Sequence, residues 1–175
     1  FMSITKEKVR SYENNYAFSH VIGYVGYDSS VKRKKNLPDL KIGKTGIEKI
    51  YDTVLVGKEG WQKIESNSSG TIVRKLDNLK STSGKNLQTY LNSDIQEYNY
   101  DLIKKMNGSM VLIDCYTGGV ISMISSPSFD INEFSYGIKN DNWKVYQSDP
   151  HKPLLNKSIS GLYAPGSTFK LIVAL

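Results

Sequence analysis

The chain has 175 residues, of which 39% are hydrophobic and 23% charged, so it is not a disordered chain and can form one core or a small domain plus part of another. Its net charge of +6 is spread along the sequence except for a basic run at 32–35, which reads as a solvated loop, so nucleic-acid binding is not predicted. The single cysteine, Cys115, excludes an internal disulfide, and His20 and His151 lack metal-ligand spacing.

The first part of the chain is predicted to be β-rich with a single helix. Residues 17–27 are β-branched and aromatic with interrupting glycines, which predicts a strand. Apolar residues recur at helical spacing over 46–55, and Gly57 follows as a stop, which predicts one helix. Residues 61–76 are predicted to form a hairpin about the turn at 67–70.

A domain boundary is predicted at residues 77–92, because the pattern changes there from strands to a helix, a hairpin and a long loop. Residues 87–91 alternate apolar and polar side chains, which predicts a short strand. Ser93 and Gln96 have the form of a capping box, in which the two side chains satisfy free backbone N–H groups at the start of a helix.

The strands expected next, at 109–115 and 120–125, are joined by a glycine-containing turn. The first is apolar on both faces, which predicts a place inside a sheet that is covered on both sides. Residues 126–160 are predicted to be mostly irregular, with one helical turn near Trp143. No apolar run reaches the length of a membrane span, and no signal-peptide pattern is present.

The candidate for chemistry is the pair Ser167 and Lys170. A serine hydroxyl needs a base within hydrogen-bond reach to act as a nucleophile, and positions i and i+3 of a helix share one face, about 5–6 Å apart. Lys170 is therefore the candidate general base, provided that burial or a second cation keeps a lysine neutral there. The start of a helix favours negative charge, so the backbone N–H of Ser167 is a candidate oxyanion donor.

Alone, a serine and a lysine at this spacing are a weak signal, because a helix cap followed by an exposed lysine has the same pattern. Pro165 and Gly166 before the serine strengthen it, as does the apolar run 171–175, which predicts a buried helix. The run ends without a capping residue, so we expect a helix that the end of the chain cuts.

The segment 161–170 resembles the serine signature of class B penicillin-binding proteins, in which S-x-x-K acts with later S-x-N and K-T-G motifs. Other segments resemble the same family in the same order. They are 19–25 and 43–57 in its pedestal, 114–119 and 127–132 in the first hairpin and loop of its transpeptidase domain, and 153–158 before the serine. The departures are Ala164, Ile131 and Cys115 in place of prolines and Lys157 in place of an arginine.

The resemblance implies an α+β fold, with a β-rich, non-catalytic pedestal (dimerisation-type) domain at 1–80 and the truncated start of a transpeptidase domain, related to serine β-lactamases, at 81–175. The elongation-specific subtype is the most similar. Ser167 would attack the D-Ala-D-Ala amide of a peptidoglycan stem peptide and pass the acyl group to a neighbouring stem, with no metal or organic cofactor. β-Lactams would acylate the same serine.

The resemblance also implies a place in cell-wall synthesis and cell shape, on the periplasmic side of the bacterial inner membrane, with a single N-terminal anchor that is missing here. Membrane proteins of the elongation machinery would be partners of the pedestal, and nucleic acid would not. The chain itself is expected to be inactive, because no S-x-N or K-T-G follows Ser167.

Three other interpretations are weighed. Lys44-Thr45-Gly46 spells K-T-G but precedes Ser167, so Lys44 is predicted to be structural or solvent-facing. A β-lactam sensor or class D-like β-lactamase is an alternative, because Ser-Thr-Phe-Lys resembles those proteins as well. In the third, the pedestal acts as a protein-interaction module, through the loop 32–35 and exposed aromatic side chains.

Overall fold

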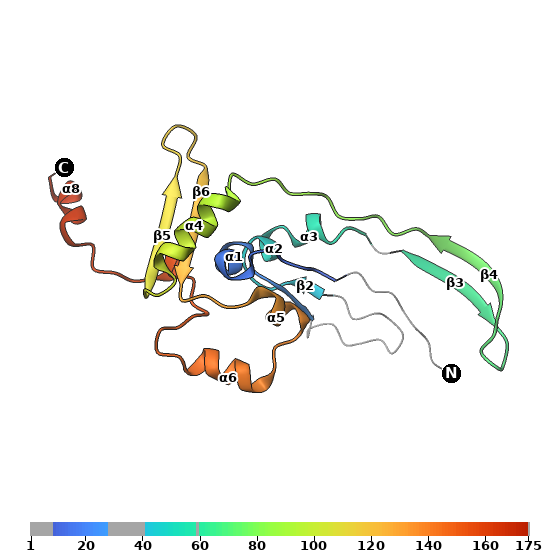
Figure 1. Ribbon diagram of the computed structural model, residues 1–175. Helices are drawn as coiled ribbons and strands as arrows, with labels where there is room; N and C mark the ends of the chain where they lie inside the picture. The colour runs from blue at the N-terminus through green and yellow to red at the C-terminus, as the bar shows by residue number, and fades with distance from the viewer. Residues whose placement is uncertain (1–8, 28–40, 59, 175) are drawn as a thin grey trace. The chain divides into compact units, whose positions relative to one another are not determined.

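The computed structural model describes residues 9–27, 41–58 and 60–174 (Figure 1). Contacts divide the chain into two compact units. The first unit contains the described residues up to Val21 and from Tyr90 onward, and the second contains those between Ile22 and Thr89. Helices occur with antiparallel two-stranded sheets, so the predicted α+β class is confirmed. The proposed domain division after residue 80 stays a prediction.

In the second unit, β1 (Val25–Tyr27) pairs with β2 (Lys41–Gly43), and two short helices follow, α2 (Gly46–Ile50) and α3 (Asp52–Leu55). The prediction of one helix over 46–55 is wrong in detail, because Tyr51 separates the two. The Gly43 N–H donates to Asp52 Oδ1 at 2.7 Å, which ties the start of α3 to the end of β2. Gly57 follows α3 with φ +79°, as the predicted stop.

The predicted hairpin at 61–76 is confirmed and runs slightly further. β3 (Trp61–Ser66) pairs with β4 (Ile72–Leu79), from Trp61 opposite Leu79 to Ser66 opposite Ile72. Asn67 makes the turn, because its N–H donates to Thr71 O and its Oδ1 accepts from the Thr71 N–H at 2.8 Å. Every residue of both strands is exposed.

Two predicted strands are wrong. Residues 15–22 form a helix, α1 (Asn15–Ile22), and strand structure begins only at Val25. Only Val21 and Ile22, at the end of this helix, are β-branched, and a distant residue, Gln96, donates to Ala17 O within it. Residues 87–91 form no strand with any other described segment, although they alternate in polarity.

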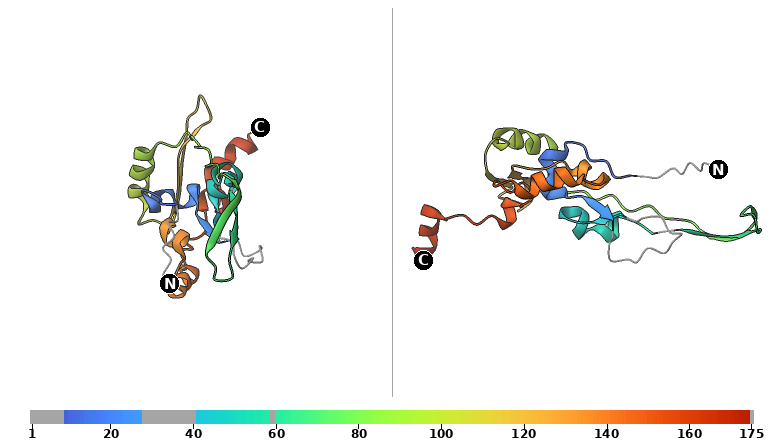
Figure 2. Two further views of the ribbon diagram at one scale, coloured as in Figure 1. Left: turned by 90° about the vertical axis from the view of Figure 1, so that its right-hand side faces the viewer. Right: turned by 90° about the horizontal axis from the view of Figure 1, so that it is seen from below.

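The first unit is built around a hairpin and a helix. β5 (Gly108–Ile113) pairs with β6 (Val120–Ser126), as predicted, and α4 (Ser93–Ile103) lies against the hairpin (Figures 1 and 2). The expectation of a sheet covered on both sides is wrong for the described residues. Val111, Leu112 and Ile113 of β5 alternate between the two faces, yet all three are exposed.

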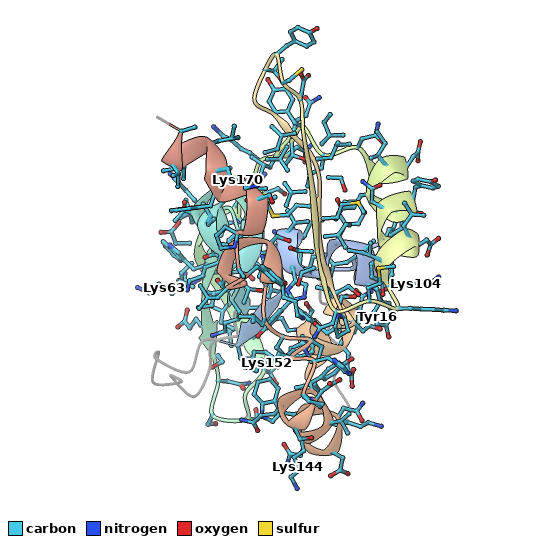
Figure 3. All side chains as sticks on the ribbon, turned by 90° about the vertical axis from the view of Figure 1, so that its left-hand side faces the viewer. Tyr16, Lys63, Lys104, Lys144, Lys152 and Lys170 are labelled. Atoms are coloured by element: carbon cyan, nitrogen blue, oxygen red, sulfur yellow. The ribbon has the colours of Figure 1, made fainter. Side chains whose placement is uncertain are left out.

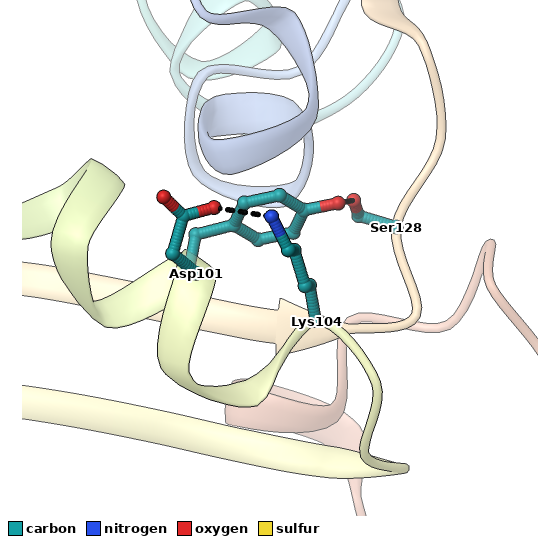
Figure 4. Close-up of polar contacts among 4 residues, drawn as sticks. Asp101, Lys104 and Ser128 are labelled. Atoms are coloured by element: carbon teal, nitrogen blue, oxygen red, sulfur yellow. Dashed lines mark hydrogen bonds and ion pairs between the residues drawn. The ribbon is translucent and has the colours of Figure 1, made fainter.

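The N-terminus of α4 also differs from the prediction. Its cap is Asn92, whose Oδ1 accepts from the Ile95 N–H at 3.0 Å. Gln96 is fully buried and bonds to other segments, so it is not the partner of Ser93 in a capping box. Further along α4, Tyr100 Oη accepts from Ser128 Oγ at 3.2 Å (Figure 4). At the end of the helix, Lys104 pairs with Asp101 at 2.8 Å.

The region 126–160 contains helical structure near Trp143, as predicted, but it has three helices where one turn was expected. It contains α5 (Ile131–Tyr136), α6 (Asn140–Ser148), which includes Trp143, and α7 (Lys157–Ser160). Residues that favour turns in a sequence serve here as helix caps. Asp130 Oδ1 accepts from the Asn132 and Glu133 N–H groups at the start of α5. The apolar core of the unit includes Ile124, Phe129, Ile131 and Phe134.

Within the described ranges, no helix combines the length and the apolar composition that a bilayer span needs. The basic loop 32–35 falls outside the described residues.

Candidate active site

Ser167 lies in a tight turn that starts a helix. Pro165 precedes a 3₁₀ turn, η1 (Gly166–Phe169), which continues directly as α8 (Lys170–Val173). Gly166 has φ +54°, a left-handed conformation that a residue with a Cβ rarely adopts. A Cβ at this position would meet no atom within 4 Å, so the backbone conformation, not space, requires the glycine.

The turn brings Ser167 and Lys170 to one side of the chain. The backbone N–H of Lys170 donates to Ser167 O, which closes the 3₁₀ turn. Side chains three positions apart eclipse each other in a 3₁₀ helix, so the two residues share a face even more closely than in an α-helix. Figure 3 labels Lys170 on this C-terminal turn. No hydrogen bond joins the Ser167 hydroxyl and the Lys170 amine, both of which the structure describes.

The predicted burial of this helix is wrong for this chain. Ser167 and Lys170 are exposed, and Leu171, Ile172 and Val173 are 77%, 65% and 73% exposed. Among the described elements, η1 is the main packing partner of α8, so no sheet or helix covers the apolar run. The turn places Ser167 and Lys170 on one face, but none of the described residues forms the water-excluding wall that a neutral lysine would need.

Sequence reasoning noted the segment 153–158 as part of the family resemblance, but it did not predict how these residues fix the chain just before this turn. Asn156 caps α7 by accepting from the Ser158 N–H at 3.1 Å, and Ser125 and Ser158 bond α7 to β6. The only sequence signal is Asn156 itself, because Asn is a preferred helix N-cap. The serines of β6 carry no motif.

A buried pair of basic side chains, His20 of α1 and Lys157 of α7, lies in the same unit. His20 and Lys157 are both buried, and burial lowers the pKa of His20 to about 4, with Lys157 as the second cause. Burial also lowers the pKa of Lys157, whose Nζ donates to Lys152 O at 3.1 Å. His151 is exposed and lies by Asn107. In the described part of the chain, no group of three or more His, Cys, Asp or Glu side chains could hold a metal ion.

The K-T-G sequence at 44–46 has a structural role in the second unit. Thr45 is the N-cap residue of α2, the Lys44 N–H donates to Tyr24 O at 2.8 Å, and the Lys44 side chain is half-buried. Gly46 has φ +59°. These contacts explain the tripeptide without catalysis.

Comparison with known proteins identifies the class. A family model described as "Penicillin-binding Protein dimerisation domain" matches residues 2–89, and one described as "Penicillin binding protein transpeptidase domain" matches residues 108–175. The chain therefore belongs to the penicillin-binding protein family, as its sequence predicted.

The relatives narrow the resemblance within the family. The chain is 36% identical to peptidoglycan D,D-transpeptidase MrdA of Escherichia coli K12, over 96% of this chain and 28% of that protein. It is 33% identical to the protein of that name from Acinetobacter baumannii, over 98% of this chain and 26% of that protein. The chain thus spans about 28% of the first of these relatives.

Two solved structures are similar in fold and sequence. One is the complex of penicillin-binding protein PBP2 and MreC from Helicobacter pylori, with a TM-score of 0.79 and 32% identity over 95% of this chain and 32% of that one. The other is Pseudomonas aeruginosa PBP2 in complex with WCK 5153, with a TM-score of 0.73 and 31% identity over 98% and 34%.

Proposed function

We propose that this chain is the part of an elongation-type peptidoglycan D,D-transpeptidase that carries the nucleophile, Ser167. The chain spans about 28% of the length of the related Escherichia coli protein. The proposal therefore concerns the longer protein that contains this segment, here called the parent protein. One observation carries it. A dimerisation-domain match is followed by a transpeptidase-domain match, within which Ser167 and Lys170 share one face of a turn.

In this reaction the Ser167 hydroxyl attacks the carbonyl carbon of the D-Ala-D-Ala amide while its proton passes to neutral Lys170. The negative oxygen that forms is stabilised by the backbone N–H of Ser167. The amide C–N bond then breaks, D-alanine leaves with a proton, and an acyl-serine ester remains. An amine of a neighbouring stem peptide attacks this ester, which forms the cross-link and frees Ser167. A β-lactam would form the same ester from its ring amide.

The test is acylation of the parent protein by a fluorescent penicillin, followed by mass spectrometry of the labelled peptide. The parent protein should be labelled at Ser167, and Ser167→Ala should abolish labelling. Ser160→Ala is the matched control, because Ser160 is an exposed serine of the neighbouring α7 with no catalytic role in this proposal. Labelling of the Ser167→Ala protein would refute the assignment.

A second readout separates the alternative class. A transpeptidase should hold the penicillin as a stable ester, whereas a class D-like β-lactamase would hydrolyse a chromogenic cephalosporin with many turnovers. Lys170→Arg, which replaces the neutral amine with a permanently charged group that cannot act as a base, should slow acylation at least about a hundredfold.

We also propose that the pedestal, residues 1–80, binds a membrane protein of the elongation machinery on the periplasmic side of the inner membrane. One related structure is a complex of PBP2 with MreC. Here the hairpin β3–β4 exposes apolar side chains, Trp61, Ile64, Ile72, Val73, Leu76 and Leu79.

The interaction is tested by affinity capture of an MreC-type protein from the same bacterium by the parent protein. Trp61→Ala should weaken capture. Gln62→Ala is the control, because Gln62 lies on the opposite face of the same strand. Equal capture by both variants would show that Trp61 is not part of the contact surface.

A further inference from the structure

We propose that Ser125 is a positioning residue for Ser167. Its hydroxyl fixes α7 to β6, and α7 is the last element that the structure ties to the sheet before the chain reaches the nucleophile. The inference rests on the proposed function, in which Ser167 is acylated, and it adds a residue that takes no part in the chemistry.

Ser125 bonds to both sides of the turn that leads into α7. Its Oγ donates to Leu155 O at 3.1 Å and accepts from the Lys157 N–H at 3.0 Å. Ser125 is 2% exposed and Lys157 is also buried, so water is a poor substitute for the bond between these two residues. Loss of this hydroxyl would leave two main-chain groups without a partner, the buried Lys157 N–H and the Leu155 carbonyl. An unpaired buried N–H disfavours the present geometry.

The residue before Ser125 takes part in the same attachment. Ser158 Oγ donates to Ile124 O at 2.7 Å, so two consecutive residues of β6 hold the first turn of α7. Asn156 caps this turn, and its Nδ2 donates to His20 O at 3.2 Å, which adds an anchor on α1. The start of α7 is therefore fixed from two elements of the same unit.

Beyond α7 the described chain has no comparable anchor. Gly161 N–H donates to Lys157 O at 3.1 Å, and the residues from 162 to 174 hydrogen-bond only with one another within the described part of the chain. Residues 162–165 have no helix or strand, and Leu162 is 99% exposed. The start of α7 therefore fixes the point from which a connection of about five residues leads to Ser167.

Ser122 supplies a matched control on the same strand. It is fully buried, and its Oγ accepts from Asn99 Nδ2 of α4 at 3.1 Å. Ser122→Ala thus removes a buried serine hydroxyl from β6 and one hydrogen bond to α4, but none to α7. Both substitutions should weaken the unit in general, but only Ser125→Ala should loosen α7.

The experiment compares the parent protein with its Ser125→Ala and Ser122→Ala variants by two readouts. The first is penicillin acylation, resolved into the dissociation constant of the initial complex and the acylation rate constant. Ser125→Ala should lower the rate constant about tenfold or more, within the roughly hundredfold loss that a displacement near 1 Å can cause, and leave the dissociation constant nearly unchanged. Ser122→Ala should change neither.

The second readout is hydrogen exchange at the amides of residues 157–161. Exchange there should be faster in Ser125→Ala and unchanged in Ser122→Ala. Equal acylation rate constants in the two variants, or unchanged exchange in Ser125→Ala, would overturn the proposal. Ser158→Ala, which removes the neighbouring bond to Ile124, gives the same test if Ser125→Ala does not fold.

Failure of the proposed function has a different signature. If the unmodified parent protein is not acylated at Ser167, the transpeptidase assignment fails and Ser125 cannot position a nucleophile. The exchange comparison would then report only whether Ser125 holds α7. If the parent is acylated normally and the two serine variants behave alike, the assignment stands and the positioning role fails.

Discussion

Gln96 and Met123 are joined by two reciprocal hydrogen bonds. Gln96 Nε2 donates to Met123 O at 2.8 Å, and the Met123 N–H donates to Gln96 Oε1 at 2.9 Å. The side-chain amide of Gln96, on α4, thus pairs with the main-chain N–H and C=O of Met123, on β6, as a residue of a neighbouring strand would. Gln96 Nε2 also donates to Ala17 O at 2.7 Å, so one buried side chain connects α4 with β6 and α1.

Gln96→Ala should destabilise the protein strongly. The substitution leaves main-chain groups of Met123 and Ala17 without partners in a buried site, and each such group costs about 1–3 kcal/mol, so we expect a loss of roughly 3 kcal/mol in the free energy of unfolding. Urea unfolding measures it. Gln147→Ala, at an exposed position of α6, should change stability by less than about 0.5 kcal/mol. Similar losses in both variants would contradict the role given to Gln96.

His20 should make the protein less stable in acid. Its pKa in the folded state is about 4, below the ordinary 6.5, first because it is buried and second because Lys157 lies nearby. The fold therefore favours the neutral ring. This stabilisation is complete above about pH 6.5 and is lost as the pH falls from there toward 4, by on the order of 3 kcal/mol in total.

Unfolding at several pH values between 7.5 and 4 measures this effect. The His20→Gln variant should lose less stability over that range than the unmodified protein. His151→Gln is the control, because His151 is exposed, and its profile should follow the unmodified one. A His20→Gln profile as steep as the unmodified profile would show that other groups cause the acid sensitivity.

Lys157→Met should raise the pKa of His20. The substitution removes the neighbouring positive charge but keeps a long apolar stem in the buried site. The pKa should rise without reaching 6.5, because burial, the larger cause of the shift, remains. Titration of the His20 ring protons by NMR provides the measurement, with Lys144→Met on the exposed face of α6 as the charge-matched control. An unchanged pKa in Lys157→Met would exclude the electrostatic contribution.

The segments predicted correctly are those with a local signal. The turn at 67–70 specifies the hairpin β3–β4 through contacts of Asn67 within the turn itself, and the turn between β5 and β6 does the same through Asp114, whose Oδ1 accepts from the Tyr116 N–H. Such geometry depends on a few adjacent residues. The spacing of Ser167 and Lys170 is also local, and the expected common face is present in the 3₁₀ turn.

The wrong predictions depended on distant partners. Residues 17–22 are β-branched in part, but four consecutive side chains are buried and Ala17 O is held by Gln96, which is 79 residues away. Gln96 itself fits a capping box by spacing, yet its amide is taken by β6. The burial of α8 could not be predicted correctly either, because it depends on a covering surface that the described residues do not include.

Gly46→Ala should lower stability without affecting the serine chemistry. Gly46 has φ +59°, and a Cβ there would lie 2.6 Å from Ile22 O, a main-chain atom that cannot move aside freely. We expect a loss of about 1–3 kcal/mol in the free energy of unfolding. Gly108→Ala is the control, because a Cβ at Gly108 meets nothing within 4 Å. In the parent protein, a folded Gly46→Ala variant should react with penicillin at the unmodified rate. A specific loss of acylation would mean that this K-T-G takes part in catalysis.

The 175-residue chain alone should not react with a labelled penicillin, whereas the parent protein should. Ser167 and Lys170 are exposed, and the apolar side chains that follow them are uncovered. A lysine in water is a poor base for serine, because the charged form is well hydrated and must lose a proton before it can accept one. Labelling of the chain, measured with the Ser167→Ala chain as background, should therefore stay at background after hours of incubation. Stoichiometric labelling that depends on Ser167 would show instead that the turn from Gly166 to Lys170 activates its serine without a surrounding domain.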